Sequence, residues 1–203
     1  MDKLFSQKFA RIISTLFVPP SFTVLIYTYF SFTLETDITK RLVLLLVTFT
    51  FGFALHIVLF LLFRKRGRLA DMDASIKEER TTPFLISSLI YLCGLILLIY
   101  YKINFIPAAF WFCYISNIFI VVLINKFWKI SVHAIGACGA LAALFYTAGP
   151  AAFIFIFIPV LVGWSRVKLK FHTVPQVLAG AVLGFCSVYL QMYFIVNWLR
   201  HTI

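Results

Sequence analysis

The residues able to do chemistry in this 203-residue chain gather in three short polar stretches between long apolar runs. They are DMDASIKEERTTPF (71–84), KISVHAIG (129–136) and SRVKLKFH (165–172). The second and third carry His133 and His172, each where a polar loop meets the next apolar run. Charge beside a membrane core is costly. We therefore expect these stretches to hold a charged ligand.

A phosphate ester would use such a set of side chains. It needs cations and N–H donors around its non-bridging oxygens, a nucleophile in line with the leaving oxygen, and an acid to protonate that oxygen. Two histidines can divide the last two tasks, and arginine makes bidentate contacts to phosphate. No carboxylate cluster with metal-ligand spacing accompanies them, so the chemistry requires neither a metal nor another cofactor.

The three stretches resemble the motifs of the type 2 phosphatidic acid phosphatases (PAP2), an integral-membrane branch of the vanadium-haloperoxidase-like phosphatases. That family carries K-x6-RP, PSGH and SR-x5-H-x3-D. Here SRVKLKFH at 165–172 has the spacing of the third motif. SVH at 131–133 stands in place of PSGH, and RTTP at 80–83 stands in place of the first motif. The resemblance covers about residues 71–184 and implies a haloperoxidase-like helical core.

The resemblance also implies roles for particular residues. His172 would be the nucleophile that forms a phosphohistidine, and His133 the acid that protonates the leaving alcohol or phosphate. Three side chains would hold the phosphate oxygens together with backbone amides: Arg80, Arg166 and Ser131.

Three departures from the family pattern affect these roles. Ile130 and Val132 replace the Pro and Gly of PSGH, so we expect the nest of backbone amides there to differ. Gln176 replaces the final aspartate of the third motif. Its amide oxygen can accept the same N–H bond but supplies no charge, so we expect His172 to be oriented yet less basic. Asp73 stands where the spacing of the first motif puts lysine. Three lysines can supply the missing positive charge, and the sequence does not choose among Lys77, Lys129 and Lys168.

Composition predicts the elements that position these residues. Hydrophobic residues make up 63% of the chain and charged residues 12%, with a mean hydropathy of +1.00, whereas soluble domains carry about 25% charged residues. The apolar runs are long and continuous, as in membrane helices, and do not alternate as barrel strands do. We predict one transmembrane domain over residues 1–203, an all-α bundle of six to seven helices.

Seven apolar runs fit this prediction: about 12–32, 42–63, 84–101, 106–125, 131–146, 151–164 and 174–199. Pro19 and Pro20 should bend the first run, and the sixth is short for a span. If every run crosses once, the three polar stretches emerge on the same face as the N-terminus. A site built from loops distant in sequence requires that arrangement.

The net charge of +11 does not indicate nucleic-acid binding, because the bases cluster in short loops and not over a solvated face. Such loops suit anionic head groups. Fourteen of the 18 Lys and Arg residues fall on the N-terminal face, which predicts a cytoplasmic site. If the seven bases from Lys77 onward bind substrate, they do not report topology, and the count without them is 7 against 4. The resemblance implies a bacterial cell membrane, and the oligomeric state stays open.

We therefore expect a phosphatase acting on a phosphomonoester or diphosphate of a phospholipid or polyprenyl lipid. One alternative is a phosphotransferase that passes the phosphoryl group to another acceptor. Another is a non-catalytic transporter or anionic-lipid-binding protein. Transporters tend to place ionisable residues in mid-span within two related halves. Here the ionisable residues lie at the ends of the runs, and no repeat is visible.

Overall fold

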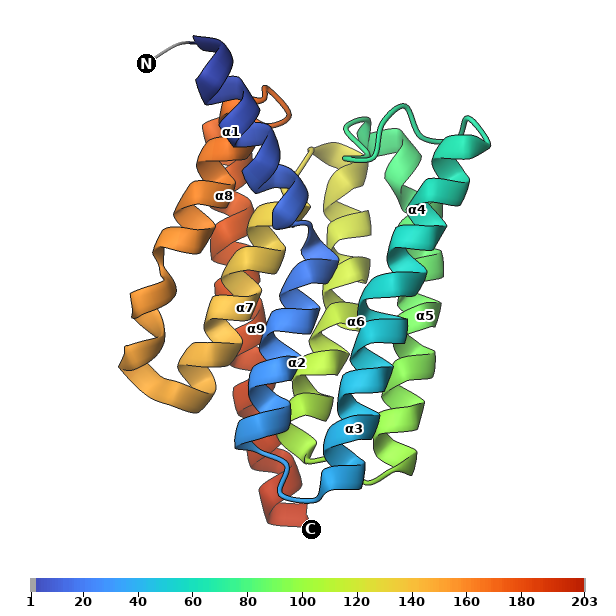
Figure 1. Cartoon of the computed structure of the whole chain (residues 1–203), viewed down its shortest axis with the longest axis vertical. Helices are drawn as coiled ribbons and strands as arrows, with labels where there is room; N and C mark the ends of the chain where they lie inside the picture. Colours follow the sequence, from blue (N-terminus) through green and yellow to red (C-terminus); the bar gives the residue numbers. More distant parts are fainter. Residues whose placement is uncertain (1–2, 203) are drawn as a thin grey trace.

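The computed structural model describes residues 3–202, which are helical with no β-strand (Figure 1). The α-helices are α1 (Lys3–Leu16), α2 (Pro19–Thr33), α3 (Ile38–Val47), α4 (Leu55–Lys65), α5 (Thr81–Tyr100), α6 (Phe105–Phe127), α7 (Val132–Ala148), α8 (Phe157–Lys168) and α9 (Val174–Thr202). A π-helical segment, η1 (Thr48–Ala54), joins α3 to α4. The 3-10 segments η2 (Lys77–Arg80) and η3 (Gly149–Phe155) precede α5 and follow α7.

Within the described residues, five helical segments are long and apolar enough to cross a membrane. They are Ile38–Lys65, Lys77–Tyr100, Phe105–Phe127, Val132–Phe155 and Val174–Thr202. Helices α1 and α2 make a sixth if the pair is counted as one bent span, with an angle of 56° between them. The bend falls at Pro19, whose ring cannot continue the preceding helix. The prediction of an all-helical, membrane-type bundle is confirmed at this level.

The sixth predicted run, residues 151–164, is not a continuous helix. The chain turns at Gly149, which has a φ of 65°, and continues through η3 before α8 begins at Phe157. Helix α8 has 12 residues, about 18 Å at 1.5 Å per residue, which is shorter than a membrane core. The count of spans is therefore five or six and not seven. Figure 1 shows α8 running antiparallel to α7, so the chain still returns to the end where α1 lies.

An aromatic cluster fills the middle of the bundle. Trp111 is fully buried, and its indole N–H donates to the carbonyl of Tyr91 at 2.7 Å. The Tyr27 ring meets it edge-on, with 5.1 Å between ring centroids. A Cβ at Gly94 would lie 2.4 Å from the indole, so only glycine leaves room for Trp111 there. This cluster holds α2, α5 and α6 together.

Helices α7 and α9 approach closely because α9 carries glycine where the two cross. A Cβ at Gly180 would lie 2.7 Å from the Ser131 carbonyl oxygen, and one at Gly184 would lie 2.4 Å from that of Ile135. Small residues four apart commonly permit such contacts between membrane helices. The start of α7, with His133, is thereby fixed against the first half of α9, which follows His172.

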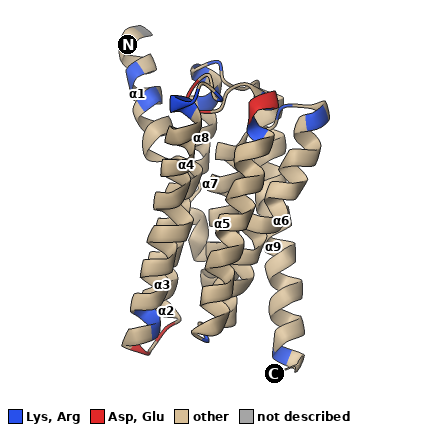
Figure 2. Ribbon diagram, turned by 90° about the vertical axis from the view of Figure 1, so that its right-hand side faces the viewer, with Lys and Arg blue, Asp and Glu red and all other residues tan. Residues whose placement is uncertain are grey.

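The charged residues divide unevenly between the two ends of the bundle. Figure 2 shows most Lys and Arg residues at the end where α1 begins, with fewer at the opposite end. Three connections meet at the richer end: residues 66–76 before η2, 128–131 before α7, and 169–173 before α9. These connections contain or adjoin the three polar stretches of the sequence.

Candidate functional site

Hydrogen bonds join the three polar stretches into one surface. Arg80 donates through Nε to the carbonyl of Ala74 at 2.6 Å and through Nη1 to that of Ile130 at 3.1 Å. Lys129 donates to the carbonyl of Phe171 at 2.7 Å. The first stretch is thus tied to the second, and the second to the third.

A cavity of about 610 Å³ opens beneath these loops. Its polar end is lined by Arg11, Ser14, Asp73, Arg80, His133 and His172. Deeper in the bundle its wall is mainly apolar, with side chains such as Phe53, Phe84 and Val121. A charged end joined to an apolar chamber suits an amphiphile with an anionic head.

The end of α8 folds back on itself and brings His172 into this cavity. Lys170 adopts a left-handed conformation with a φ of 59°, as commonly occurs where a helix ends. The carbonyl of Arg166 then accepts the N–H groups of Phe171 and His172 at 3.1 and 3.3 Å. The backbone of Arg166 therefore sets the position of His172.

Gln176 fixes the tautomer of His172. The backbone N–H of Thr173 can only donate, so the Gln176 atom 3.1 Å from it is the amide oxygen Oε1. The same oxygen lies 3.2 Å from Nδ1 of His172. Nδ1 must then carry the ring proton, which leaves the lone pair on Nε2. The contact expected for the glutamine that replaces the motif aspartate is present.

The electrostatic surroundings of His172 keep its ring neutral. Burial and the positive charges of Arg80, Arg166 and Lys129 lower the pKa of His172 to about 3. With Gln176 as its neighbour, the ring gains no anionic partner to oppose these effects. An uncharged imidazole with a free lone pair can act as a nucleophile at neutral pH.

His133 is the second residue of α7 and lies two positions after the N-cap Ser131. The Ser131 hydroxyl accepts the N–H of Ala134 at 3.4 Å and is fully buried; it caps the helix and does not line the cavity. His133 does line the cavity, and its buried Nε2 has no hydrogen-bond partner among residues 3–202. The first turn of α7 also offers unpaired N–H groups suited to an anion.

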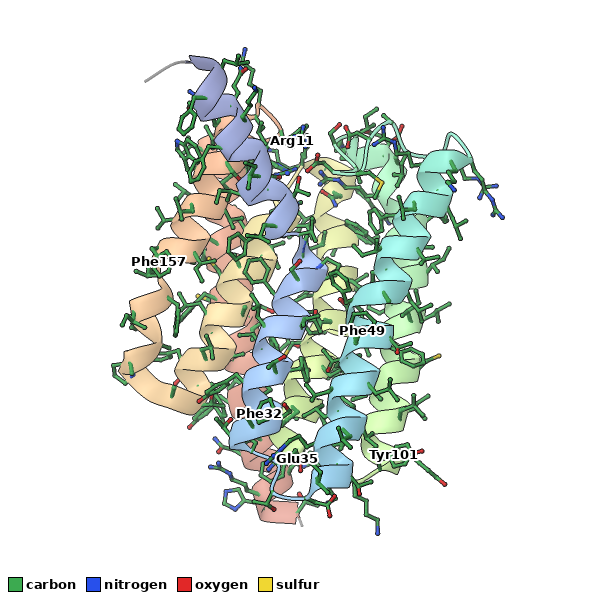
Figure 3. All side chains as sticks on the ribbon, viewed as in Figure 1. Arg11, Phe32, Glu35, Phe49, Tyr101 and Phe157 are labelled. Atoms are coloured by element: carbon green, nitrogen blue, oxygen red, sulfur yellow. The ribbon has the colours of Figure 1, made fainter. Side chains whose placement is uncertain are left out.

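Arg166 is completely buried, and its guanidinium already forms an ion pair with the carboxylate of Asp73. Its Nη1 donates to Asp73 and, at 2.5 Å, to the hydroxyl of Ser14. Phe171 covers one face of the guanidinium, with 4.4 Å between Cζ and the ring centroid. Arg11 reaches the other oxygen of Asp73 at 2.7 Å; Figure 3 shows Arg11 projecting from α1 toward the polar loops.

Asp73 is the anion of the polar end. Burial alone would raise the pKa of Asp73, but Arg166 and Arg11 more than offset it and hold that pKa below its ordinary value. Asp73 is therefore ionised at neutral pH. The aspartate found at the position of the motif lysine is thus the counter-ion of Arg166.

None of the three candidate lysines lines the cavity, and they differ in their contacts. Lys77 donates to the carbonyls of Asn125 and Lys126 at the end of α6, at 3.2 and 3.3 Å. Lys168 is half-buried and makes no hydrogen bond or ion pair within the described part of the chain. Burial and the nearby Arg80 and Arg166 lower the pKa of Lys129. Lys129 is accordingly the lysine electrostatically coupled to the site.

Sequence reasoning missed Arg11 and Ser14, which α1 brings to the polar end of the cavity. Arg11 had been counted only as one of the N-terminal bases. The available signal was their spacing of three, which puts both side chains on one face of a helix. That face contacts Arg166 of α8 and Asp73 of the loop before η2.

No group of three or more His, Cys, Asp and Glu side chains suitable for a metal ion occurs within residues 3–202. None of the protein-family models, curated proteins or solved structures compared with the chain matches it.

Proposed function

We propose that this chain is a membrane lipid-phosphate phosphatase of the PAP2 type. One observation supports this most directly: His133 and His172, 39 positions apart, line the same cavity, whose polar end also holds arginines and whose depth is apolar. A nucleophile, an acid and cations around one space match the needs of phosphoryl transfer. The apolar depth matches a lipid tail.

In the first step, Nε2 of His172 attacks phosphorus in line with the leaving oxygen. A P–N bond forms as the P–O bond breaks, and His133 gives the leaving oxygen its proton. The product alcohol, or phosphate from a diphosphate, departs and leaves a phosphohistidine. In the second step water attacks phosphorus, His133 takes a proton from that water, and the P–N bond breaks to release inorganic phosphate.

The remaining residues hold the phosphate and the histidine in line. Gln176 keeps the Nδ1 proton of His172 away from the reacting face. Arg80, which lines the cavity, binds the non-bridging oxygens, and Arg166 adds the N–H groups of its guanidinium that have no partner among the described residues. Ser131 contributes by capping α7, which directs the first N–H groups of that helix toward the phosphate. Preorganised donors of this kind each contribute about 3 kcal/mol to transition-state stabilisation.

The substrate in this proposal is a phosphomonoester or diphosphate of a phospholipid or polyprenyl lipid. Its head lies at the loop end, and its tail enters the chamber between helices. In this proposal the loop end faces the cytoplasm, which the excess of Lys and Arg at that end favours (Figure 2), and the membrane is that of a bacterial cell, as the resemblance implies. A cysteine at Arg68, an exposed loop position, should react with a membrane-impermeant maleimide only after cells are opened, and reaction in intact cells would reverse the orientation.

The function is tested by phosphate release from a panel of lipid phosphates and diphosphates, using the purified chain in detergent. The wild type should release inorganic phosphate from at least one of them, and His133→Ala should abolish it. His201→Ala is the matched control, because His201 is exposed near the C-terminus, and it should keep full activity. Binding without release would favour the non-catalytic alternative. Transfer of the phosphoryl group to an added alcohol in place of water would favour the phosphotransferase.

A further inference from the structure

The carboxylate of Asp73 sits at the polar end of the cavity as a ligand of three other side chains. Arg11 contacts one of its oxygens at 2.7 Å, and Arg166 contacts the other. The hydroxyl of Ser14 also lies 3.4 Å from the oxygen that Arg166 binds. These partners come from α1 and α8, and only 11% of the Asp73 side chain is exposed. A negative group from the loop between α4 and η2 thus fills a pocket made by two other helices.

This pocket offers more donors than a carboxylate uses. Arg166 is fully buried, yet its Nε and Nη2 have no hydrogen-bond partner among the described residues. Nε2 of His133, on the same cavity, also has none. Buried polar groups in native proteins are rarely left unpaired. A carboxylate has two oxygens in a plane, whereas a phosphate has at least three non-bridging oxygens arranged as part of a tetrahedron. A phosphate therefore suits this donor set better than Asp73 does.

We propose that Asp73 is an internal substitute for the substrate phosphate, and that a bound phosphate takes its place on Arg166, Arg11 and Ser14. This inference deepens the proposed function and rests on it for the identity of the anion. It assigns Arg11 and Ser14 to the binding of that phosphate. It also accounts for an aspartate at the position where the motif has lysine.

The surrounding contacts allow the side chain to leave without unfolding the loop. The carbonyl of the next residue, Ala74, is held by Arg80 at 2.6 Å. Asp71 holds Ser75 through its backbone N–H at 3.1 Å. On the preceding side, the carbonyl of Asp71 accepts the N–H of Ala74 at 3.2 Å. Because the backbone on both sides of Asp73 has its own partners, rotation of the Asp73 side chain is sufficient for the exchange.

Exchange with an internal anion lowers the affinity of the site for every ligand. A ligand must compete with a tethered carboxylate. The apparent affinity of the ligand is its intrinsic affinity multiplied by the fraction of molecules in which Asp73 has left the arginines. The same factor applies to every ligand, so the exchange raises the intrinsic affinity that a ligand needs and leaves the ratio of two ligands' affinities unchanged. A phosphate monoester carries about 1.5–2 negative charges at neutral pH and a diphosphate ester carries more, whereas the diester of an ordinary membrane phospholipid carries a single charge. We therefore expect terminal phosphates, which gain most from the two guanidinium groups, to be the ligands that displace Asp73.

The test is the affinity of the purified full chain for inorganic phosphate, measured by calorimetric titration at pH 7.5. Asp73→Asn removes the competing charge and should tighten phosphate binding about tenfold or more, the usual effect of one charge-assisted hydrogen bond. The matched control is Asp71→Asn, which makes the same change of charge in the same loop, where Asp71 bonds Ser75 and not the arginines. It should change the affinity less than threefold.

Weaker or unchanged binding in Asp73→Asn would overturn the inference, because Asp73 would then organise the arginines and not compete. An equal gain in both variants would also overturn it, since the effect would be general electrostatics. If Asp73→Asn does not fold, the wild type decides: its structure with saturating phosphate should show phosphate on Arg166 and Asp73 displaced. Asp73 still on Arg166 in that structure would refute the exchange. Neither measurement requires turnover, so absence of hydrolysis would count against the proposed function alone.

Discussion

Gly184→Ala is the substitution with the largest expected effect on the site from outside the cavity. The added Cβ would lie 2.4, 2.8 and 3.0 Å from three backbone atoms of Ile135. Ordinary contacts between carbon and a carbonyl oxygen are about 3.3–3.6 Å, so α7 and α9 must separate by about 1 Å. No side chain can rotate away, because every atom in contact belongs to the backbone of α7.

Two measurable effects follow from this separation. Overpacking of this kind costs about 1–3 kcal/mol, which corresponds to a fall in Tm of about 2–12 °C for a chain of this size. His133 lies two residues before Ile135, while His172 precedes α9, so the same shift moves the two rings apart. A misplacement of about 1 Å can lower a rate about 100-fold. The assays are thermal unfolding in detergent and the rate of phosphate release.

Val182→Leu is the matched control for Gly184→Ala. It also adds one carbon to α9, but Val182 is 63% exposed on the outer face of the bundle. Tm should change by less than about 1 °C, as for other surface substitutions. If Gly184→Ala keeps both the Tm and the rate of the wild type, the close approach of α7 and α9 does not position the histidines.

Three further predictions concern the site itself. Gln176→Asp places a negative charge beside Nδ1 of His172, which raises the pKa of that ring above about 3. The acid limb of the pH–rate profile should therefore move to higher pH, and the rate should increase. A profile that superimposes on that of the wild type would contradict the assigned contact. Lys129→Met removes the hydrogen bond to the Phe171 carbonyl and should lower kcat/KM about fivefold to tenfold, the effect of one hydrogen bond. The control Lys126→Met changes an exposed neighbour and should leave kcat/KM unchanged. Equal losses in the two variants would mean that only net charge matters. The unfolded chain protonates His172 near pH 6.5 but the folded chain only near pH 3, so the contribution of His172 should make stability fall as pH decreases from about 6.5 to about 3. His172→Gln should make the fall of Tm over that range shallower, and identical slopes would refute the lowered pKa.

The parts of the fold that sequence could predict depend on strong local signals. Long apolar runs identified the helices, and Pro19 identified the bend between α1 and α2. The spacing of the third motif put Gln176 four residues after His172, in the first turn of α9, from which its side chain reaches back to His172 in the preceding loop. Each of these features depends on residues near one another in the chain.

The parts that sequence could not predict depend on contacts between distant segments. The sixth run looked continuous by composition, but Gly149 turns the chain and η3 interrupts the helix. The approach of Arg11 and Ser14 to Arg166 requires α1 to pack beside α8, which no periodicity reports. Asp73 was considered as a lost lysine, and its place between two guanidinium groups appears only when three segments are brought together.

The most direct test of the proposed chemistry is to capture the phosphoryl group on the enzyme. The purified chain is mixed with a radiolabelled lipid phosphate, quenched in alkali within the first turnover and digested, and the labelled peptide is sequenced. The account predicts an alkali-stable, acid-labile phosphoryl group on His172, which is absent in His172→Ala together with all phosphate release. A label on another residue, or turnover that persists in His172→Ala, would contradict it.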